Sequence, residues 1–221
     1  MFTKIQIAID GPAASGKSVV GHLLSKKLDY LFLDTGLMYR AATKIISDHN
    51  LLLDDLENIK LLIKDSTFEL VDNSGHPRLL VNSKDLTDSL KTIQIDRNVS
   101  TISKIPEVRN ILVSHQRTIA SNDNIVMVGR DIGSIVLPNA NLKIYLDASV
   151  EVRAKRRLND KKQNFPPNDF DIIKHDLIQR DKTDSTREHS PLMIPKGSIV
   201  IDTSDLNISE VIESILKELK N

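Results

Sequence analysis

The sequence contains no cysteine and no tryptophan, and aromatic residues make up 4% of its 221 residues. Without cysteine the chain can form no disulfide, no thiolate nucleophile and no cysteine-ligated zinc or iron–sulfur centre, which fits a reducing compartment. Its 30 basic residues balance its 30 acidic residues, so no overall positive field draws it to nucleic acid or to an anionic membrane. Any binding of an anion must therefore depend on a local cluster.

Long apolar runs are also missing from the sequence. No apolar stretch approaches the roughly 20 residues that cross a bilayer, and the chain starts on a strand-like segment in place of a charged and apolar leader. These features predict a cytoplasmic protein with neither a membrane nor a nucleic-acid partner. The length favours one main α/β domain with insertions.

Short apolar runs bounded by turn residues alternate with helical patterns along the chain. This order is typical of a parallel sheet covered by helices on both faces. The expected strands are residues 4–10, 30–34, 124–129, 142–147 and 198–202.

About 90 residues separate the second and third expected strands, more than one crossover helix needs, so an inserted unit must occupy this gap. Within it, residues 67–71 and 78–81 flank a turn-forming cluster and predict a β hairpin. The remaining expected elements are helices at 54–64, 92–103, 106–121, 150–158 and 209–219, and a mobile polar loop at 159–168 that holds Pro166 and Pro167.

A phosphate-binding loop directly follows the first expected strand. The octapeptide fits the pattern G-x-x-x-x-G-K-[ST] and consists of Gly11, Pro12, Ala13, Ala14, Ser15, Gly16, Lys17 and Ser18. Its glycines let successive backbone N–H groups point inward, and the following helix adds its positive dipole end. Lys17 can then reach a β- or γ-phosphate, while the Ser18 hydroxyl can hold Mg²⁺. The loop predicts a nucleotide-using protein.

Two further turns follow the second and third expected strands at their carboxyl ends. Residues 34–40 end in Arg40, and the second turn is Gly129-Arg130-Asp131. Ligands of open parallel sheets bind at this edge, so the two arginines can clamp a second phosphate. A carboxylate there can accept from an exocyclic amine such as cytosine N4. The guanine-reading sequence Asn-Lys-x-Asp is absent, which argues against a GTPase.

A third charged cluster spans residues 180–187, after the basic segment 153–157. Arginines that close over phosphoryl transfer neutralise charge on the equatorial oxygens and expel water, so Arg180 and Arg187 are candidates for a lid. The alternative for residues 153–157 is a solvated charged helix face. A nucleic-acid patch is a third option, and the lack of interleaved aromatics disfavours it.

Four colinear segments resemble bacterial cytidylate kinases, which are P-loop nucleoside monophosphate kinases. They are residues 9–18, 33–40, 129–133 and 180–187, the last followed by Ser190-Pro191-Leu192. The resemblance extends over the whole chain, including residues 84–88 and 201–203. It implies an α/β P-loop kinase fold, a five-stranded parallel sheet flanked by helices, in a single domain of residues 1–221. An NMP-binding insertion with a β hairpin would span about 36–105 and a mobile lid about 153–190.

The resemblance also implies an activity and site residues. The chain would transfer the γ-phosphate of ATP to CMP or dCMP with Mg²⁺, giving CDP or dCDP and ADP, as a monomer. The phosphate loop and Arg157 would bind ATP, with Ser18 on the metal. The residues implied on the acceptor phosphate are Thr35, Arg40 and Arg130, with Asp34 nearby. Those implied on cytosine are Ser100, Arg109 and Asp131, and those on the ribose are Arg180 and Asp184. Arg187 would bridge to the transferred group, so the catalytic set is Lys17, Arg130, Arg180 and Arg187.

Several positions leave alternatives open. Thr183 stands where many family members have arginine, so one lid charge is missing. Asp29 replaces a common glycine, and Ser134 replaces a threonine and keeps its hydroxyl. Ser100 could instead be an ordinary helix-surface serine. Other acceptors of the same fold, UMP, dTMP, AMP or shikimate, and a nucleotide-dependent regulator or nucleic-acid-stimulated ATPase remain as competing functions.

Overall fold

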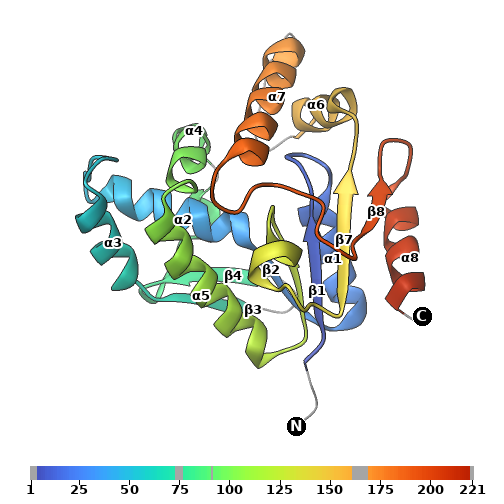
Figure 1. Cartoon of the computed structure of the whole chain (residues 1–221), viewed down its shortest axis with the longest axis horizontal. Helices are drawn as coiled ribbons and strands as arrows, with labels where there is room; N and C mark the ends of the chain where they lie inside the picture. The colour runs from blue at the N-terminus through green and yellow to red at the C-terminus, as the bar shows by residue number, and fades with distance from the viewer. Residues whose placement is uncertain (1–3, 73–76, 91, 161–168, 220–221) are drawn as a thin grey trace.

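A five-stranded parallel sheet forms the centre of the computed structural model, which describes residues 4–72, 77–90, 92–160 and 169–219 (Figure 1). All five predicted strands are confirmed, each within its expected range. In sheet order they are β2 (Leu31–Asp34), β6 (Ile125–Val128), β1 (Gln6–Asp10), β7 (Leu142–Asp147) and β8 (Ile199–Asp202). The central β1 pairs in parallel with β6 and with β7. The order reverses next to β1, which is where open α/β sheets bind ligands.

Helices cover both faces of this sheet, as the apolar strands require. Alternate residues of β1 point to opposite sides: Ile7 and Ile9 pack with α1 (Lys17–Leu28) and α8 (Ile208–Leu219), and Ala8 packs with α2 (Thr35–Asp48) and α5 (Pro106–Asn122). Pro106 begins α5 as predicted, and the helix ends at Asn122. Since β1 is buried on both faces, the loop that leaves its end lies at the centre of the molecule.

The insertion after α2 packs directly on the sheet. Its elements are α3 (Leu56–Lys64), β3 (Phe68–Asp72), β4 (Pro77–Val81), β5 (Lys84–Asp85), η1 (Thr87–Leu90) and α4 (Ile93–Ile102). The predicted hairpin is confirmed by the antiparallel pairing of β3 with β4, while residues 73–75 of its turn lie outside the described part. The third strand, β5, was not predicted, because two residues carry no periodic pattern. Ile59 and Phe68 of the insertion share one core cluster with Leu33 of the sheet.

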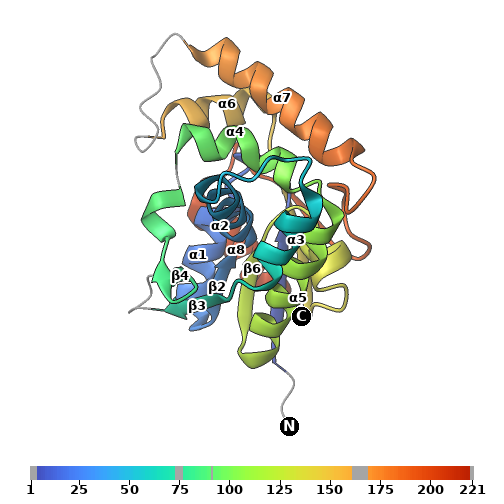
Figure 2. The same cartoon turned by 90° about the vertical axis from the view of Figure 1, so that its left-hand side faces the viewer.

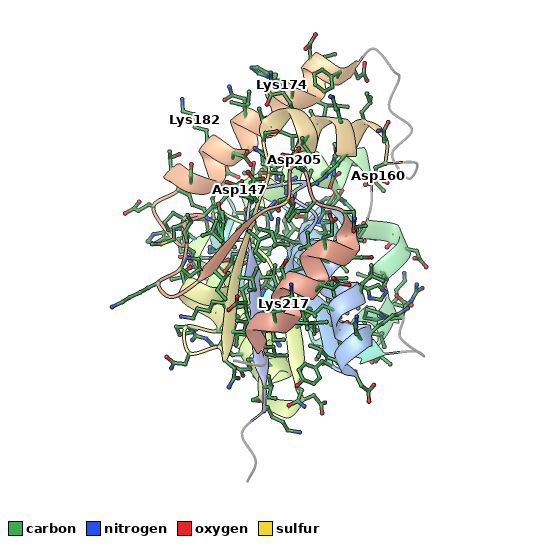
Figure 3. All side chains as sticks on the ribbon, turned by 90° about the vertical axis from the view of Figure 1, so that its right-hand side faces the viewer. Asp147, Asp160, Lys174, Lys182, Asp205 and Lys217 are labelled. Carbon is green, nitrogen blue, oxygen red and sulfur yellow. The ribbon has the colours of Figure 1, made fainter. Side chains whose placement is uncertain are left out.

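Two helices lie beyond the carboxyl ends of the strands (Figure 1). These are α6 (Val150–Leu158), with the predicted bounds, and α7 (Phe170–Thr186); the loop expected at 159–168 falls largely outside the described residues. They pack on each other and on Ala13 through Ala154 and Leu177. Figure 3 labels Lys174 and Lys182 on α7, at the top of the view, and Lys217 on α8, lower in the molecule. Among the described residues, no helix has the length and apolar character needed to span a membrane.

Candidate active site

The phosphate loop requires glycine at its first position. Gly11 has φ of 147°, and a Cβ there would lie 2.0 Å from the carbonyl oxygen of Leu146. Lys17 is 6% exposed, and its ammonium donates to Ser15 Oγ at 3.2 Å and to the Pro12 carbonyl, across the loop. Burial, with repulsion from Arg130, lowers the pKa of Lys17 well below its ordinary value. A phosphate placed in the loop would supply the negative charge that this buried cation lacks.

Helix α6 packs against the phosphate loop and holds it through two arginines. Arg153 is 6% exposed, and its Nη1 donates to the carbonyl of Ala13 at 3.2 Å and to Asp181 at 2.6 Å. Arg156 donates to the carbonyl and hydroxyl oxygens of Thr203, and the Thr203 hydroxyl donates to the backbone carbonyl oxygen of Ser15. The solvated-face alternative is therefore wrong for Arg153, because its charge is satisfied by buried carbonyl and carboxylate oxygens.

The end of β2 reaches the phosphate loop through Asp34. Ser18 Oγ donates to Asp34 Oδ2 at 2.6 Å, and the other carboxylate oxygen caps α2 by accepting from the Gly36 amide. Next to it, the Thr35 hydroxyl donates to the Val128 carbonyl at 3.0 Å and ties this turn to the end of β6. Ser18 and Asp34 therefore offer a hydroxyl and a carboxylate side by side, the oxygen ligands that Mg²⁺ prefers. No cluster of three or more His, Cys, Asp or Glu suited to a metal occurs among the described residues.

The predicted acceptor arginines come together under α6 and α7. Arg130, after β6, donates from Nε to Asp184 of α7 at 3.0 Å. Arg40 donates from Nε and Nη2 to Asp96 of α4, and Arg157 of α6 donates to the other oxygen of the same carboxylate. Figure 2 shows α4 lying alongside α6 and α7. Arg180 interacts electrostatically with Arg130, Arg40 and Asp96, so these two groups of side chains lie together at one edge of the sheet.

A second buried charge cluster surrounds Asp131. Arg109 of α5 is 3% exposed, donates from Nη2 to Asp131 Oδ2, and places its guanidinium 5.3 Å from the centre of the Tyr39 ring. Arg187 approaches the other carboxylate oxygen at 3.9 Å. Two cations against one carboxylate leave an excess of positive charge at this point.

Some donors in this region have no hydrogen-bond partner within the described part of the chain. They include Nε of Arg180, Nε of Arg109 and Nη2 of Arg187. Burial, with repulsion from Arg130, lowers the pKa of Arg180 to about 10, so it remains a cation at neutral pH. An unpaired buried donor costs about 1–3 kcal/mol or more when charged, so these groups favour an anionic ligand.

A groove of about 600 Å³ opens beside this cluster, between the start of α5 and the end of α7. Its lining includes Arg187, Thr183 and Lys104. The size is in the range of small-molecule sites. Thr183 therefore lies at the wall of this groove.

The comparisons with known proteins match the chain to one family. The family model described as cytidylate kinase matches residues 7–221. A cytidylate kinase of Geobacillus sp. (strain WCH70) is 42% identical over 217 residues, covering 98% of this chain and 97% of the relative. One of Ligilactobacillus salivarius (strain UCC118) is 44% identical, covering 98% and 96%. The chain belongs to the cytidylate kinase family.

Solved structures outside the cytidylate kinase family share the fold. A shikimate kinase from Bacteroides thetaiotaomicron superposes with a TM-score of 0.54 at 12% identity, covering 98% of this chain and 99% of that one. A gluconokinase from Sinorhizobium meliloti 1021 gives 0.51 at 16% identity, covering 100% and 94%. At these identities the likeness shows the fold alone, and it confirms the predicted P-loop kinase architecture.

Within this member of the cytidylate kinase family, the side chain of one predicted residue, Ser100, makes no hydrogen bond to either cluster in the described part of the chain. The structure places Ser100 on α4, where its carbonyl oxygen accepts the Ser103 hydroxyl at 3.0 Å. Its contact with a base stays a prediction. The sequence assigned no role to two residues that the structure places in the site, Asp10 and Asp96, and it left Arg153 open between a lid residue and a solvated charge. For Asp10 a signal was available, since a carboxylate at the carboxyl end of β1 directly precedes the phosphate loop.

Asp10 fixes the loop that carries Arg130 and Asp131. It is fully buried, and its two carboxylate oxygens accept from the amides of Ile132 and Gly133, both at 2.7 Å. These bonds hold the start of η2 (Ile132–Val136), a short π-helix that the sequence did not predict. Burial outweighs the two amide bonds and raises the pKa of Asp10 to about 6.

The Asp10→Asn variant tests this arrangement through the pH dependence of stability. Between pH 4 and 7 folded Asp10, with a pKa of about 6, binds more proton than the unfolded residue at 3.8. The contribution of Asp10 to the free energy of unfolding of the wild type therefore decreases as the pH rises, by about 3 kcal/mol in total. Asn carries no such dependence, so we expect the variant to gain stability relative to the wild type as pH rises.

Urea unfolding at pH 4.5 and 7.5 measures this difference, with the exposed Asp54→Asn variant as control. An Asn amide can accept from only one of the two backbone amides, so turnover should fall about tenfold or more as Arg130 and Asp131 lose their fixed positions. A stability difference that does not change with pH, together with wild-type turnover, would remove Asp10 from this role.

Proposed function

We propose that this chain transfers the γ-phosphoryl group of ATP to CMP or dCMP, giving CDP or dCDP and ADP. The observation that carries the proposal is the convergence of Lys17 in the phosphate loop with Arg40, Arg130, Arg180 and Arg187 at one sheet edge, next to buried Asp131. A loop for one nucleotide and a separate arginine group for a second phosphate fit a kinase with a phosphate acceptor better than a regulator or a hydrolase.

On the donor side, the phosphate loop and Arg157 would bind ATP. Ser18 and Asp34 would hold Mg²⁺, which supplies charge neutralisation on the phosphate oxygens when bound. Two protein oxygens suit this ion, because Mg²⁺ keeps several waters and takes its remaining ligands from phosphates. Arg153 and Arg156 keep the loop in shape through their bonds to Ala13 and Thr203.

On the acceptor side, Thr35, Arg40 and Arg130 would hold the CMP phosphate. Because that phosphate is already an oxyanion at pH 7, no side chain needs to act as a nucleophile. Lys17, Arg130, Arg180 and Arg187 would stabilise the charge on the transferred group, and α6 and α7 would exclude water.

Asp131, Arg109 and Ser100 would read the cytosine. A carboxylate oxygen of Asp131 accepts from the N4 amine, and the excess positive charge from Arg109 and Arg187 suits the acceptor atoms of the base. Arg180 and Asp184 would take the ribose, with Asp184 held by Arg130 at 3.0 Å. The buried setting makes a missing partner costly, and this favours discrimination against uracil.

The proposal also assigns separate roles to two segments of the chain. Residues of about 36–105 would act as the NMP-binding insertion and about 153–190 as the lid, within one domain of residues 1–221. The protein would work as a cytoplasmic monomer on small nucleotides, without nucleic-acid or membrane partners.

A panel of acceptors tests this function. We expect Mg-ATP to release ADP at a high rate with CMP and dCMP, and more than tenfold more slowly with UMP, AMP, dTMP and shikimate, in a coupled assay. Fast turnover with another acceptor would overturn the base-site assignment. ADP release that needs no acceptor, or that RNA stimulates, would overturn the kinase assignment.

A further inference from the structure

The carboxylate of Asp96 joins two arginines from different parts of the fold. Oδ1 accepts from Nε and Nη2 of Arg40 at 3.1 and 2.9 Å, and Oδ2 accepts from Nη2 of Arg157 at 3.0 Å. Asp96 and Arg40 belong to α4 and α2, whereas Arg157 belongs to α6. The side chains of Arg40, Asp96 and Arg157 are 17%, 18% and 26% exposed, so water screens these ion pairs only in part.

These bonds fix the orientation of the Arg40 guanidinium. Besides its two bonds to Asp96, Arg40 donates from Nη1 to the Gly36 carbonyl at 3.3 Å. Three of the five N–H groups of an arginine are used in this way. One N–H on each terminal nitrogen remains for a ligand such as a phosphate oxygen.

We propose that Asp96 is a positioning residue that couples the acceptor and donor subsites, by holding Arg40 for the acceptor phosphate and Arg157 for ATP with one carboxylate. This inference rests on the proposed function. When ATP orders Arg157, the same carboxylate orders Arg40, so the acceptor meets a preorganised arginine and binds more tightly. Burial opposes ionisation of Asp96, but Arg40 and Arg157 keep its pKa below the ordinary value, so the carboxylate is charged at neutral pH.

Calorimetric titration of CMP into the chain tests the coupling, with and without saturating Mg²⁺ and the unreactive analogue β,γ-imido-ATP. In the wild type we expect the analogue to tighten CMP binding about tenfold. In Asp96→Asn, CMP alone should bind about tenfold more weakly, and the tightening should fall to less than twofold. The KM for CMP should rise more than kcat falls, since the variant loses orientation of a binding group.

A second variant removes the other arginine that Asp96 holds, Arg157 of α6. Arg157→Gln leaves the pair of Asp96 with Arg40 in place, so CMP alone should bind within twofold of the wild type while the tightening by the analogue is lost. A general structural defect would weaken the binding of CMP alone together with the tightening by the analogue, and would not change only one of them. The matched control is Asp88→Asn, because Asp88 pairs with Arg78 at 2.6 Å in the same insertion but is 81% exposed and away from both subsites.

The outcomes separate this inference from the proposed function. A wild-type chain that binds no CMP would overturn both. If the wild type binds CMP and Asp96→Asn binds it with the same affinity and the same tightening by the analogue, the inference alone would be overturned. Tighter CMP binding in that variant would also overturn it, because Asp96 would then be competing with the acceptor phosphate. Should Asp96→Asn fail to fold, tightening that persists in Arg157→Gln would contradict the coupling.

Discussion

Lys17→Met is expected to lower turnover of CMP and ATP by about 10³-fold while the chain stays folded. The ammonium of Lys17 lies within the phosphate loop, where little water screens it, so its charge acts strongly on the transferred group. A 10³-fold loss corresponds to about 4 kcal/mol of transition-state stabilisation. Methionine keeps the unbranched shape of the side chain and is one atom shorter, and removal of a buried cation relieves its desolvation. The free energy of unfolding should therefore change by about 1 kcal/mol or less.

Steady-state kinetics with CMP and Mg-ATP measure the loss, and thermal unfolding checks the fold. The control is Lys217→Met on α8, an exposed lysine well away from the phosphate loop (Figure 3). We expect wild-type turnover in the control. If Lys17→Met kept turnover within tenfold of the wild type at wild-type stability, the phosphate loop would not be the donor site.

Asp131→Asn is expected to lower the preference for CMP over UMP by about 100-fold, measured as the ratio of kcat/KM values. The carboxylate accepts from the N4 amine of cytosine and repels the O4 carbonyl oxygen of uracil, whereas an amide can turn its NH₂ group toward O4. The same change removes the ionised partner of buried Arg109, so stability should also fall, by about 3 kcal/mol.

Because the preference is a ratio within one variant, a loss of folded protein cancels from it. The assay compares CMP with UMP in the wild type, in Asp131→Asn and in the exposed Asp54→Asn control, which should keep the wild-type ratio. Equal loss of activity toward both nucleotides would show that Asp131 supports the fold or the phosphate site and does not read the base.

Local patterns explain how much of this protein could be predicted. The strands of the sheet are apolar runs bounded by turn residues, and the strand, glycine-rich loop and helix around Lys17 follow from contiguous residues. Helix ends were also accessible, since Pro106 begins α5 and α6 has the predicted bounds Val150–Leu158. Features that depend on fewer residues, such as the two-residue strand β5 and the π-helix η2, carry no periodic signal and were missed.

The pairing of charged side chains could not be predicted from local patterns in the sequence. Sequence motifs marked Arg40, Arg130 and Asp131, but Asp96 lies 56 residues from Arg40 and 61 from Arg157, in a helix without a chemical motif. In the sequence Arg153 is one of several charges on a helix, and only the packing of α6 over the phosphate loop shows that it is buried. Likewise, Asp10 reads as the last residue of a strand until β6 brings Ile132 and Gly133 against it.

The sequence by itself determined the sheet, the phosphate loop and the family, because these depend on contiguous residues whose spacing and chemistry are visible along the chain. Only the tertiary structure decided which carboxylate pairs with which arginine, which cations lose their water and which backbone amides Asp10 fixes. Pairing and desolvation depend on distances between segments far apart in sequence. Those distances are set by packing of the insertion, α6 and α7 on the sheet edge, and no local pattern records them.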